Sequence, residues 1–108
     1  MSNDVIKYPD DSFDNMKIFA DKYKFNFPYL YDESQDVAKA YDAACTPDFY
    51  VYDSNLKLVY RGQLDDSRPG NDTLSDGADI ENAIECLVSG KDNKKPQKPS
   101  IGCNIKWK

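Results

Sequence analysis

The 108-residue sequence contains no histidine, few cysteines and no long apolar run. Without histidine, imidazole-based catalysis and most zinc sites are excluded. Its three cysteines, Cys45, Cys86 and Cys103, are odd in number and far apart, which fits neither a disulfide framework nor zinc-ligand spacing. No apolar stretch approaches the ~20 residues that span a bilayer, and the first residues lack a secretory signal pattern. The default expectation is therefore a cytoplasmic location.

The sequence also lacks an excess of positive charge, because its formal net charge is −5. This acidity argues against a nucleic-acid partner, which requires a basic face, and against adhesion to anionic membranes. The scattered carboxylates form no recognised calcium loop, so we expect neither a metal nor a cofactor. With 40% hydrophobic and 31% charged residues, the composition fits one small globular domain of marginal stability.

The middle of the chain predicts two strands joined by a tight turn. Aromatic and aliphatic strand formers fill residues 49–52 and 58–60, and the intervening Asp53-Ser54-Asn55 has the short polar side chains typical of turns. A proline at the head of a strand costs no ladder donor, so Pro47 marks where the first strand begins. Cys45 then lies just before that strand, at the end where loops meet.

Two helices and a short strand are predicted before this hairpin. Residues 9–25 open with a helix start signal and continue with apolar residues at spacings of three and four, which predicts an amphipathic helix. Residues 27–32 predict a strand that is short or lies near a sheet edge, because Pro28 would interrupt a central ladder. Ser34 is the expected cap of a second helix over about 34–43.

After the hairpin, residues 63–75 are rich in Asp, Gly, Pro and Asn and predict a loop. A last helix is expected over 76–89, with Asp76 as its cap and Asp79 in a position like that of a capping box. Gly90 is the expected terminator in the left-handed conformation.

The expected organisation is one partial domain over residues 1–90 followed by a linker and tail over 91–108. The tail carries two isoleucines and Trp107, which a free segment would rarely keep together in water, so we expect it to dock. The docking surface is either its own domain or another segment.

Five segments together carry a resemblance to a known family. They are Tyr8-Pro9-Asp10-Asp11-Ser12, Phe27-Pro28-Tyr29-Leu30-Tyr31-Asp32-Glu33, Ala44-Cys45-Thr46-Pro47-Asp48-Phe49, residues 60–71 and residues 99–107. Nearly the whole chain resembles the thioredoxin-like redoxins related to alkyl hydroperoxide reductase and thiol-specific antioxidant proteins. The resemblance implies an α/β fold, the C-terminal part of a thioredoxin-like domain. Such a fold has a mixed sheet with flanking helices, a cis-proline before a strand, a β-hairpin, a C-terminal helix and a docked tail.

The resemblance also implies an activity. Such proteins are thiol-disulfide oxidoreductases or peroxide-reducing antioxidants in cell redox homeostasis, with a thiol reductant and a peroxide or disulfide substrate as partners. Family members begin with a strand, a Cys-x-x-Cys loop and a helix, whereas this sequence contains no Cys-x-x-Cys. We therefore expect impaired activity in this chain, which resembles a truncated redoxin. The alternative is a non-catalytic thioredoxin-fold fragment or binding module. We also expect low stability for the chain alone, and a complementary N-terminal segment or self-association is the partner that this expectation suggests.

Two cysteines are candidate catalytic residues. Cys45 could form a thiolate if Arg61 on the paired strand supplies positive charge, or it could be a small buried residue. Cys103 could be a resolving thiol or a packing residue of the docked tail. The two could form a disulfide only if the tail folds back to within about 7 Å between Cα atoms.

Four residues are candidate substrate-binding residues. Thr46 and Pro47 would offer backbone groups to which a substrate peptide could add as a strand. Arg61 would contribute its positive charge. Arg68 lies among several aspartates, so its loop either holds a local ion pair or closes over the active-site face.

Overall fold

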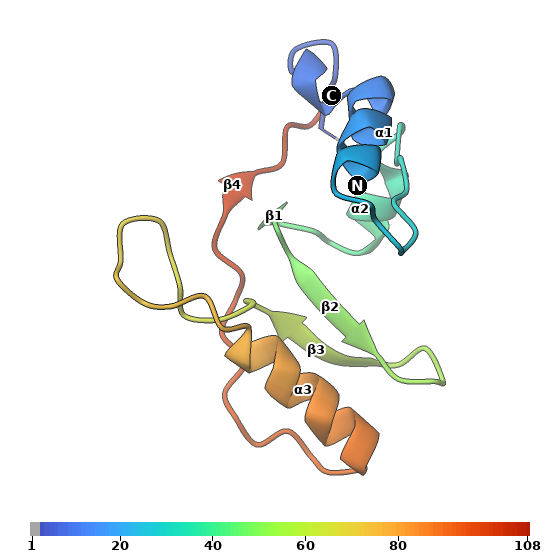
Figure 1. The fold of residues 1–108 in the computed structure, drawn as a ribbon. Coiled ribbons are helices and arrows are strands. Elements are labelled where there is room, and N and C mark those ends of the chain that lie inside the picture. Colours follow the sequence, from blue (N-terminus) through green and yellow to red (C-terminus); the bar gives the residue numbers. More distant parts are fainter. Residues whose placement is uncertain (1–2) are drawn as a thin grey trace. The chain divides into compact units, whose positions relative to one another are not determined.

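The computed structural model describes residues 3–108 and divides the chain into two compact units (Figure 1). The first takes the residues up to Ala44 together with Ile105–Lys108, and the second is Cys45–Asn104. Across the described residues, three α-helices and a 3-10 helix accompany four short strands, which form two antiparallel pairs. The predicted α/β class is therefore confirmed. The predicted boundary at residue 90 stays a prediction.

The first unit begins with η1 (Pro9–Asp11) and α1 (Phe13–Lys22). The Ser12 hydroxyl caps α1 by accepting the Asn15 backbone N–H at 3.3 Å. The helix is shorter than the predicted 9–25 because Lys24 adopts a left-handed φ of 52°, which ends the helical path.

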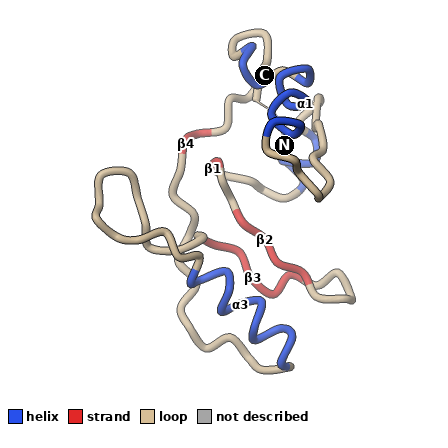
Figure 2. The backbone as a smooth tube through the Cα atoms, in the orientation of Figure 1, coloured by secondary structure: helices blue, strands red, loops and turns tan. Residues whose placement is uncertain are grey.

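The predicted strand over 27–32 is wrong, since these residues are irregular (Figure 2). Pro28 has no N–H to donate, and the Asp32 carboxylate turns towards the next helix, α2 (Asp36–Ala40). That carboxylate accepts the backbone N–H groups of Val37 and Ala38 at 3.3 and 2.9 Å. Asp32 therefore satisfies part of the first turn of α2. The predicted cap, Ser34, lies one residue before the N-cap Gln35, and its hydroxyl accepts the Asp36 N–H at 3.2 Å.

The last residues of the chain fold into the first unit around Gln35, which is fully buried. The Gln35 side chain donates to the Lys106 carbonyl and accepts the Lys108 N–H, both at 2.9 Å. The Asp4 N–H also donates to the Lys106 carbonyl, and Ile105 is buried. The predicted docking of the tail is present here.

In the second unit, β2 (Phe49–Tyr52) and β3 (Leu58–Gly62) form the predicted hairpin. One carboxylate oxygen of Asp53 accepts two backbone N–H groups of the turn at 2.9 Å each, which explains why short polar residues lie there. Tyr60 on β3 is 2% exposed and anchors the small core beneath α3 (Ala78–Ser89), which lies against the hairpin (Figure 1).

The start of α3 differs from the prediction, whereas its end agrees. The N-cap residue is Gly77 in the left-handed region, and Asp76 accepts the Ala78 N–H at 3.0 Å from outside the helix. Asp79 does not complete a capping box, because its buried carboxylate is engaged by other side chains. Gly90 ends the helix at φ 67°, as expected.

The second antiparallel pair joins segments far apart in the sequence. Strand β1 (Cys45–Thr46) pairs with β4 (Cys103–Asn104), with Cys45 opposite Asn104 and Thr46 opposite Cys103. Cys45 therefore belongs to a short strand rather than to the predicted loop end. The segment that precedes β4, residues 91–102, contains neither helix nor strand (Figure 2).

Candidate functional site at the Thr46–Pro47 turn

The candidate site is the turn between β1 and β2, where the Thr46–Pro47 peptide bond is cis, as the resemblance implies. Cys45 immediately precedes it and is 9% exposed. The Cys45 sulfur lies 3.5 Å from both the Pro47 and the Ser100 carbonyl oxygens, either of which can accept its S–H. The sequence left a reactive and a packing environment open for Cys45, and the observed environment is a packed one.

The electrostatics at Cys45 favour the neutral thiol. Burial raises the pKa of the Cys45 thiol, and the nearby Asp48 carboxylate raises it further. The Arg61 guanidinium and the Gly102 N–H act in the opposite direction with smaller effects on this pKa. Because the thiolate is the nucleophile, Cys45 in this environment is a weak one.

Arg61 is paired, which explains its limited effect on Cys45. Its guanidinium forms an ion pair with the Asp48 carboxylate at 3.2 Å and lies 5.1 Å from the centre of the Tyr50 ring. The Tyr50 hydroxyl donates to the same carboxylate at 3.1 Å. The predicted activation of Cys45 by Arg61 is therefore outweighed by the residue that Arg61 pairs with.

Cys103 has the opposite environment, since it is exposed on β4. It is the cross-strand partner of Thr46, whose hydroxyl donates to the Cys103 carbonyl at 3.3 Å. Successive side chains of a strand point to opposite faces, so Cys45 and Cys103 project from opposite faces of this ladder. The tail folds back as the hypothesis of a disulfide requires, but both cysteines are free and the register turns them apart.

Two glycines that sequence reasoning missed allow the tail to approach this site. A Cβ on Gly102 would lie 2.2 Å from the Thr46 carbonyl oxygen, and one on Gly62 would lie 2.5 Å from the Lys98 carbonyl oxygen. The Ser100 hydroxyl donates to the Gly62 carbonyl at 2.5 Å. The backbone of the tail therefore packs directly on the backbone of β1 and β3. The sequence feature that could have indicated this close approach is the glycine that precedes Cys103.

Arg68 stabilises its own loop. One terminal nitrogen of its guanidinium donates to the Asp65 and Ser67 carbonyls at 2.9 and 2.6 Å, and the other donates to the Gln63 side-chain carbonyl. These contacts engage both terminal nitrogens of the guanidinium. The role of Arg68 in substrate binding stays a prediction.

Beneath this loop lies a buried polar cluster that the sequence did not reveal. The Gln63 amide donates to Asp79 at 2.5 Å, and Lys95 forms an ion pair with the same carboxylate at 2.5 Å. The hydrogen bond from Gln63, followed by that from Lys95, lowers the pKa of Asp79. Asp65 accepts the Ser67 hydroxyl and the Gly77 N–H, and these bonds lower the pKa of Asp65. The cluster thus fastens the loop to the start of α3.

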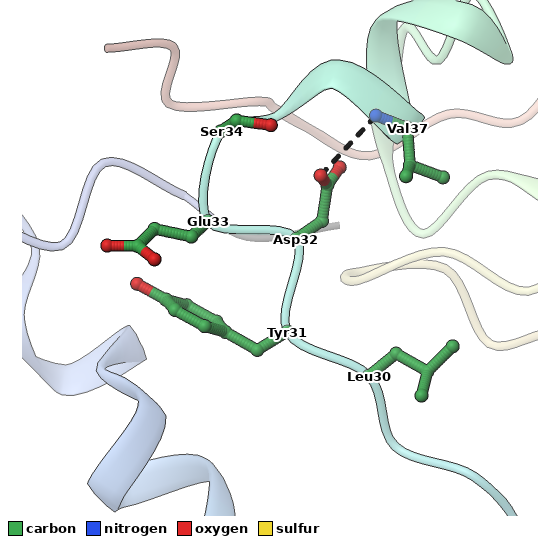
Figure 3. Close-up of a pocket in the computed structure, with 6 residues that line it drawn as sticks. All are labelled: Leu30, Tyr31, Asp32, Glu33, Ser34 and Val37. Carbon is green, nitrogen blue, oxygen red and sulfur yellow. Dashed lines mark hydrogen bonds between the residues drawn. The ribbon is translucent and has the colours of Figure 1, made fainter.

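The first unit contains an open hollow of about 700 Å³ (Figure 3). It is lined by Leu30, Tyr31, Asp32, Glu33, Ser34 and Val37. None of these is a predicted site residue, and the Asp32 carboxylate is directed at the N–H of Val37. Within residues 3–108, no three Cys, Asp or Glu side chains are grouped so as to hold a metal ion. The described helices are all too short or too polar to cross a membrane.

The comparisons with known proteins agree with this fold. The chain is similar to an uncharacterized conserved protein from Geobacillus kaustophilus, with 60% identity and a TM-score of 0.95. It is also similar to a hypothetical protein from Sinorhizobium meliloti 1021, with 50% identity and a TM-score of 0.95. Each comparison covers 99% of this chain, which spans 57% and 58% of the two relatives. No curated protein matches.

The sequence model of the AhpC/TSA family matches residues 4–61, which is more than half of the chain. This match includes β1, the cis-proline turn and most of the hairpin. The chain therefore belongs to the AhpC/TSA family of thioredoxin-like redoxins.

Proposed function

We propose that this chain belongs to a redoxin-type thiol oxidoreductase that reduces a peroxide or a disulfide. The observation that carries the proposal is its membership of the AhpC/TSA family. Within the described residues, Cys103 is the exposed cysteine, and it is in register with Thr46 at the candidate site. Cys103 is therefore our first choice for the reactive thiol, and Cys45 is the second because it would first have to be uncovered.

In the peroxide reaction, the sulfur of Cys103 attacks one peroxide oxygen. The S–O bond forms as the O–O bond breaks, and the leaving oxygen takes up a proton. The resulting sulfenic acid condenses with a thiol of an external reductant, which yields a mixed disulfide and water. A second thiol of the reductant then releases Cys103 and becomes oxidised to a disulfide.

A second candidate is a non-catalytic binding module, which the opposite orientations of Cys45 and Cys103 favour. Cysteines that project from opposite faces of one ladder cannot form a disulfide without a change of register. A binding module would use Thr46, Pro47 and Arg61 without any redox step. For both candidates we propose a cytoplasmic location, where free thiols persist.

Assays of peroxide consumption and of disulfide reduction distinguish the two candidates. We expect Cys103→Ser to lose at least about tenfold in turnover, because it removes the reacting sulfur. The matched control is Cys86→Ser on α3, which should retain the turnover of the wild type. A loss confined to Cys45→Ser would transfer the reactive role to Cys45. Absence of turnover in the wild type would favour the binding module.

A further inference from the structure

We propose that residues 96–99 present a docking surface for a partner domain whose groove is lined by aromatic side chains and flanked by carboxylates. We call this segment the proline ridge, because it begins and ends with proline. The inference goes beyond the thiol chemistry proposed above and does not depend on it. It rests on the spacing of the two prolines, on the side chains that fix the segment to its own unit, and on the charge around it.

The sequence of the ridge, Pro96-Gln97-Lys98-Pro99, favours the polyproline II conformation. A proline ring fixes its own φ and moves the preceding residue away from helical angles. The backbone agrees, because residues 96–101 follow a bend at Lys95, contain neither helix nor strand and have no positive φ. A polyproline II helix has about three residues per turn, so residues three positions apart share a face. Pro96 and Pro99 therefore share one.

One face of the segment binds the backbone of β3. The Gln97 side-chain oxygen accepts the Arg61 N–H at 3.1 Å, and the Ser100 hydroxyl donates to the Gly62 carbonyl at 2.5 Å. Gln97 and Ser100 have the same three-residue spacing as the two prolines. This face is therefore occupied by the chain itself.

Lysine side chains hold a second face. The Lys98 ammonium group forms an ion pair with Asp66 at 2.8 Å, and the Lys98 carbonyl also accepts the Gln63 N–H at 2.9 Å. Lys95, three positions earlier, forms an ion pair with the buried Asp79 at 2.5 Å. The segment is thus fixed before any partner arrives, which lowers the ordering cost of binding.

The third face carries Pro96 and Pro99, and both are exposed. Proline has no N–H to donate, so this face does not suit pairing with another strand. Exposed proline rings at this spacing instead fit between the aromatic rings of a groove, which is how Pro-x-x-P segments are recognised. The fold therefore fixes two faces of the ridge and leaves the one that such a groove would bind exposed.

The ridge lies in a basic segment of an acidic chain. Residues 91–99 contain four lysines and one aspartate, whereas the whole chain has a formal net charge of −5. Lys95 and Lys98 are paired with carboxylates, but Lys91 and Lys94 are exposed. Carboxylates beside the aromatic groove of a partner would complement this charge and accelerate the encounter. Because the ridge is short, we expect a small interface and a transient complex.

The test measures, by isothermal titration calorimetry, the affinity of the full chain for two purified domains that bind proline-rich segments, an SH3 domain and a WW domain. We expect at least one to bind with a Kd of about 100 µM or tighter, and Pro96→Ala combined with Pro99→Ala to weaken this binding at least about tenfold. The matched control is Pro69→Ala, which removes an exposed proline of the 63–75 loop and should bind like the wild type. Lys94→Glu should weaken binding by reversing the charge beside the ridge. Absence of binding to both domains would overturn the proposal, as would equal binding by the double variant.

A free peptide of residues 93–100 keeps the test valid if the double variant does not fold. The peptide carries both prolines but lacks the contacts that fix them, so it should bind the same domain at least about threefold more weakly than the full chain does. The same peptide with alanine at both proline positions should not bind. Equal or tighter binding by the unmodified peptide would contradict a ridge prepared by the fold. Self-association of the chain that the double variant loses would overturn the proposal of a different partner, because it would assign the ridge to a second copy.

Discussion

At the scale of single residues, Cys45 and Cys103 differ although they belong to the same two-stranded ladder. Cys45 is buried and lies near Asp48, and its burial and the Asp48 charge both raise the pKa of its thiol. Cys103, in contrast, is exposed. Alkylation of single-thiol variants at pH 8 should therefore be at least about tenfold slower at Cys45 than at Cys103. Mass spectrometry after timed quenching measures both rates. Equal rates in the folded protein would show that the burial of Cys45 does not persist in solution.

The raised pKa of Cys45 also has a consequence for stability. The folded chain holds the thiol proton more tightly than the unfolded chain does, so the unfolded chain ionises first as the pH rises. This contribution to stability is present below the ordinary thiol pKa and is lost as the pH rises towards the folded value. Cys45→Ala should weaken the alkaline decline of stability, which denaturant titrations at several pH values measure.

The pKa of Asp79 is shifted in the opposite direction to that of Cys45. Hydrogen bonds from Gln63 and Lys95 lower its pKa, so its contribution is present above the ordinary carboxyl pKa and is lost as the pH falls through the folded value. Asp79→Asn should lower the melting temperature at pH 7 by about 4–8 °C, since it removes the charge that Lys95 pairs with. The difference from the wild type should shrink in acid. The exposed Asp92→Asn is a matched control that should leave the melting curve unchanged.

Residue-scale features were the hardest to obtain from the sequence. That Cys45 is either reactive or buried follows from residue type, but the choice depends on Ser100, which is 55 positions away. The burial of Gln63 and Asp79 depends on side-chain hydrogen bonds between a loop and a helix. Polar residues of this kind are usually exposed, so composition alone argues for the wrong environment.

At the scale of elements, local chemistry explains which predictions succeeded. The hairpin was predictable because strand formers flank an Asp53 turn that satisfies itself by local hydrogen bonds. Gly90 was predictable as a terminator for the same reason. The strand predicted over 27–32 is absent, because the Asp32 carboxylate binds α2 and no neighbouring strand pairs with this segment within the described residues.

The hydrogen bonds that the Gln35 side chain forms with Lys106 and Lys108 support a prediction about the end of the chain. Gln35→Ala removes two hydrogen bonds to the last residues and leaves the Lys106 carbonyl and the Lys108 N–H with fewer partners. We expect the free energy of unfolding to fall by about 1–3 kcal/mol in urea titrations. The exposed Lys94→Ala should leave it unchanged. If Gln35→Ala were as stable as the wild type, the docking of residues 105–108 would contribute nothing to folding.

At the scale of the whole molecule, the described residues contain a small core. Six hydrophobic residues are buried, whereas nineteen large hydrophobic side chains are exposed, and this imbalance predicts low stability. The hairpin forms a sheet from its own two strands within the described residues. Because the chain spans 57% of the Geobacillus kaustophilus relative, we propose that a complementary segment or a second copy covers part of this surface.

This proposal makes opposite predictions for the isolated and the complemented chain. Alone, the chain should melt below about 45 °C or sediment as an oligomer. Addition of the segment of the Geobacillus kaustophilus relative that lies outside the match should raise the melting temperature as its concentration increases, because a ligand that binds only the folded state stabilises it by mass action. A scrambled segment of the same composition is the control for nonspecific effects. A monomer that melts cooperatively at 45–65 °C, the ordinary mesophile range, and does not respond to the segment would show that the small core suffices. The exposed apolar side chains would then need no partner for folding.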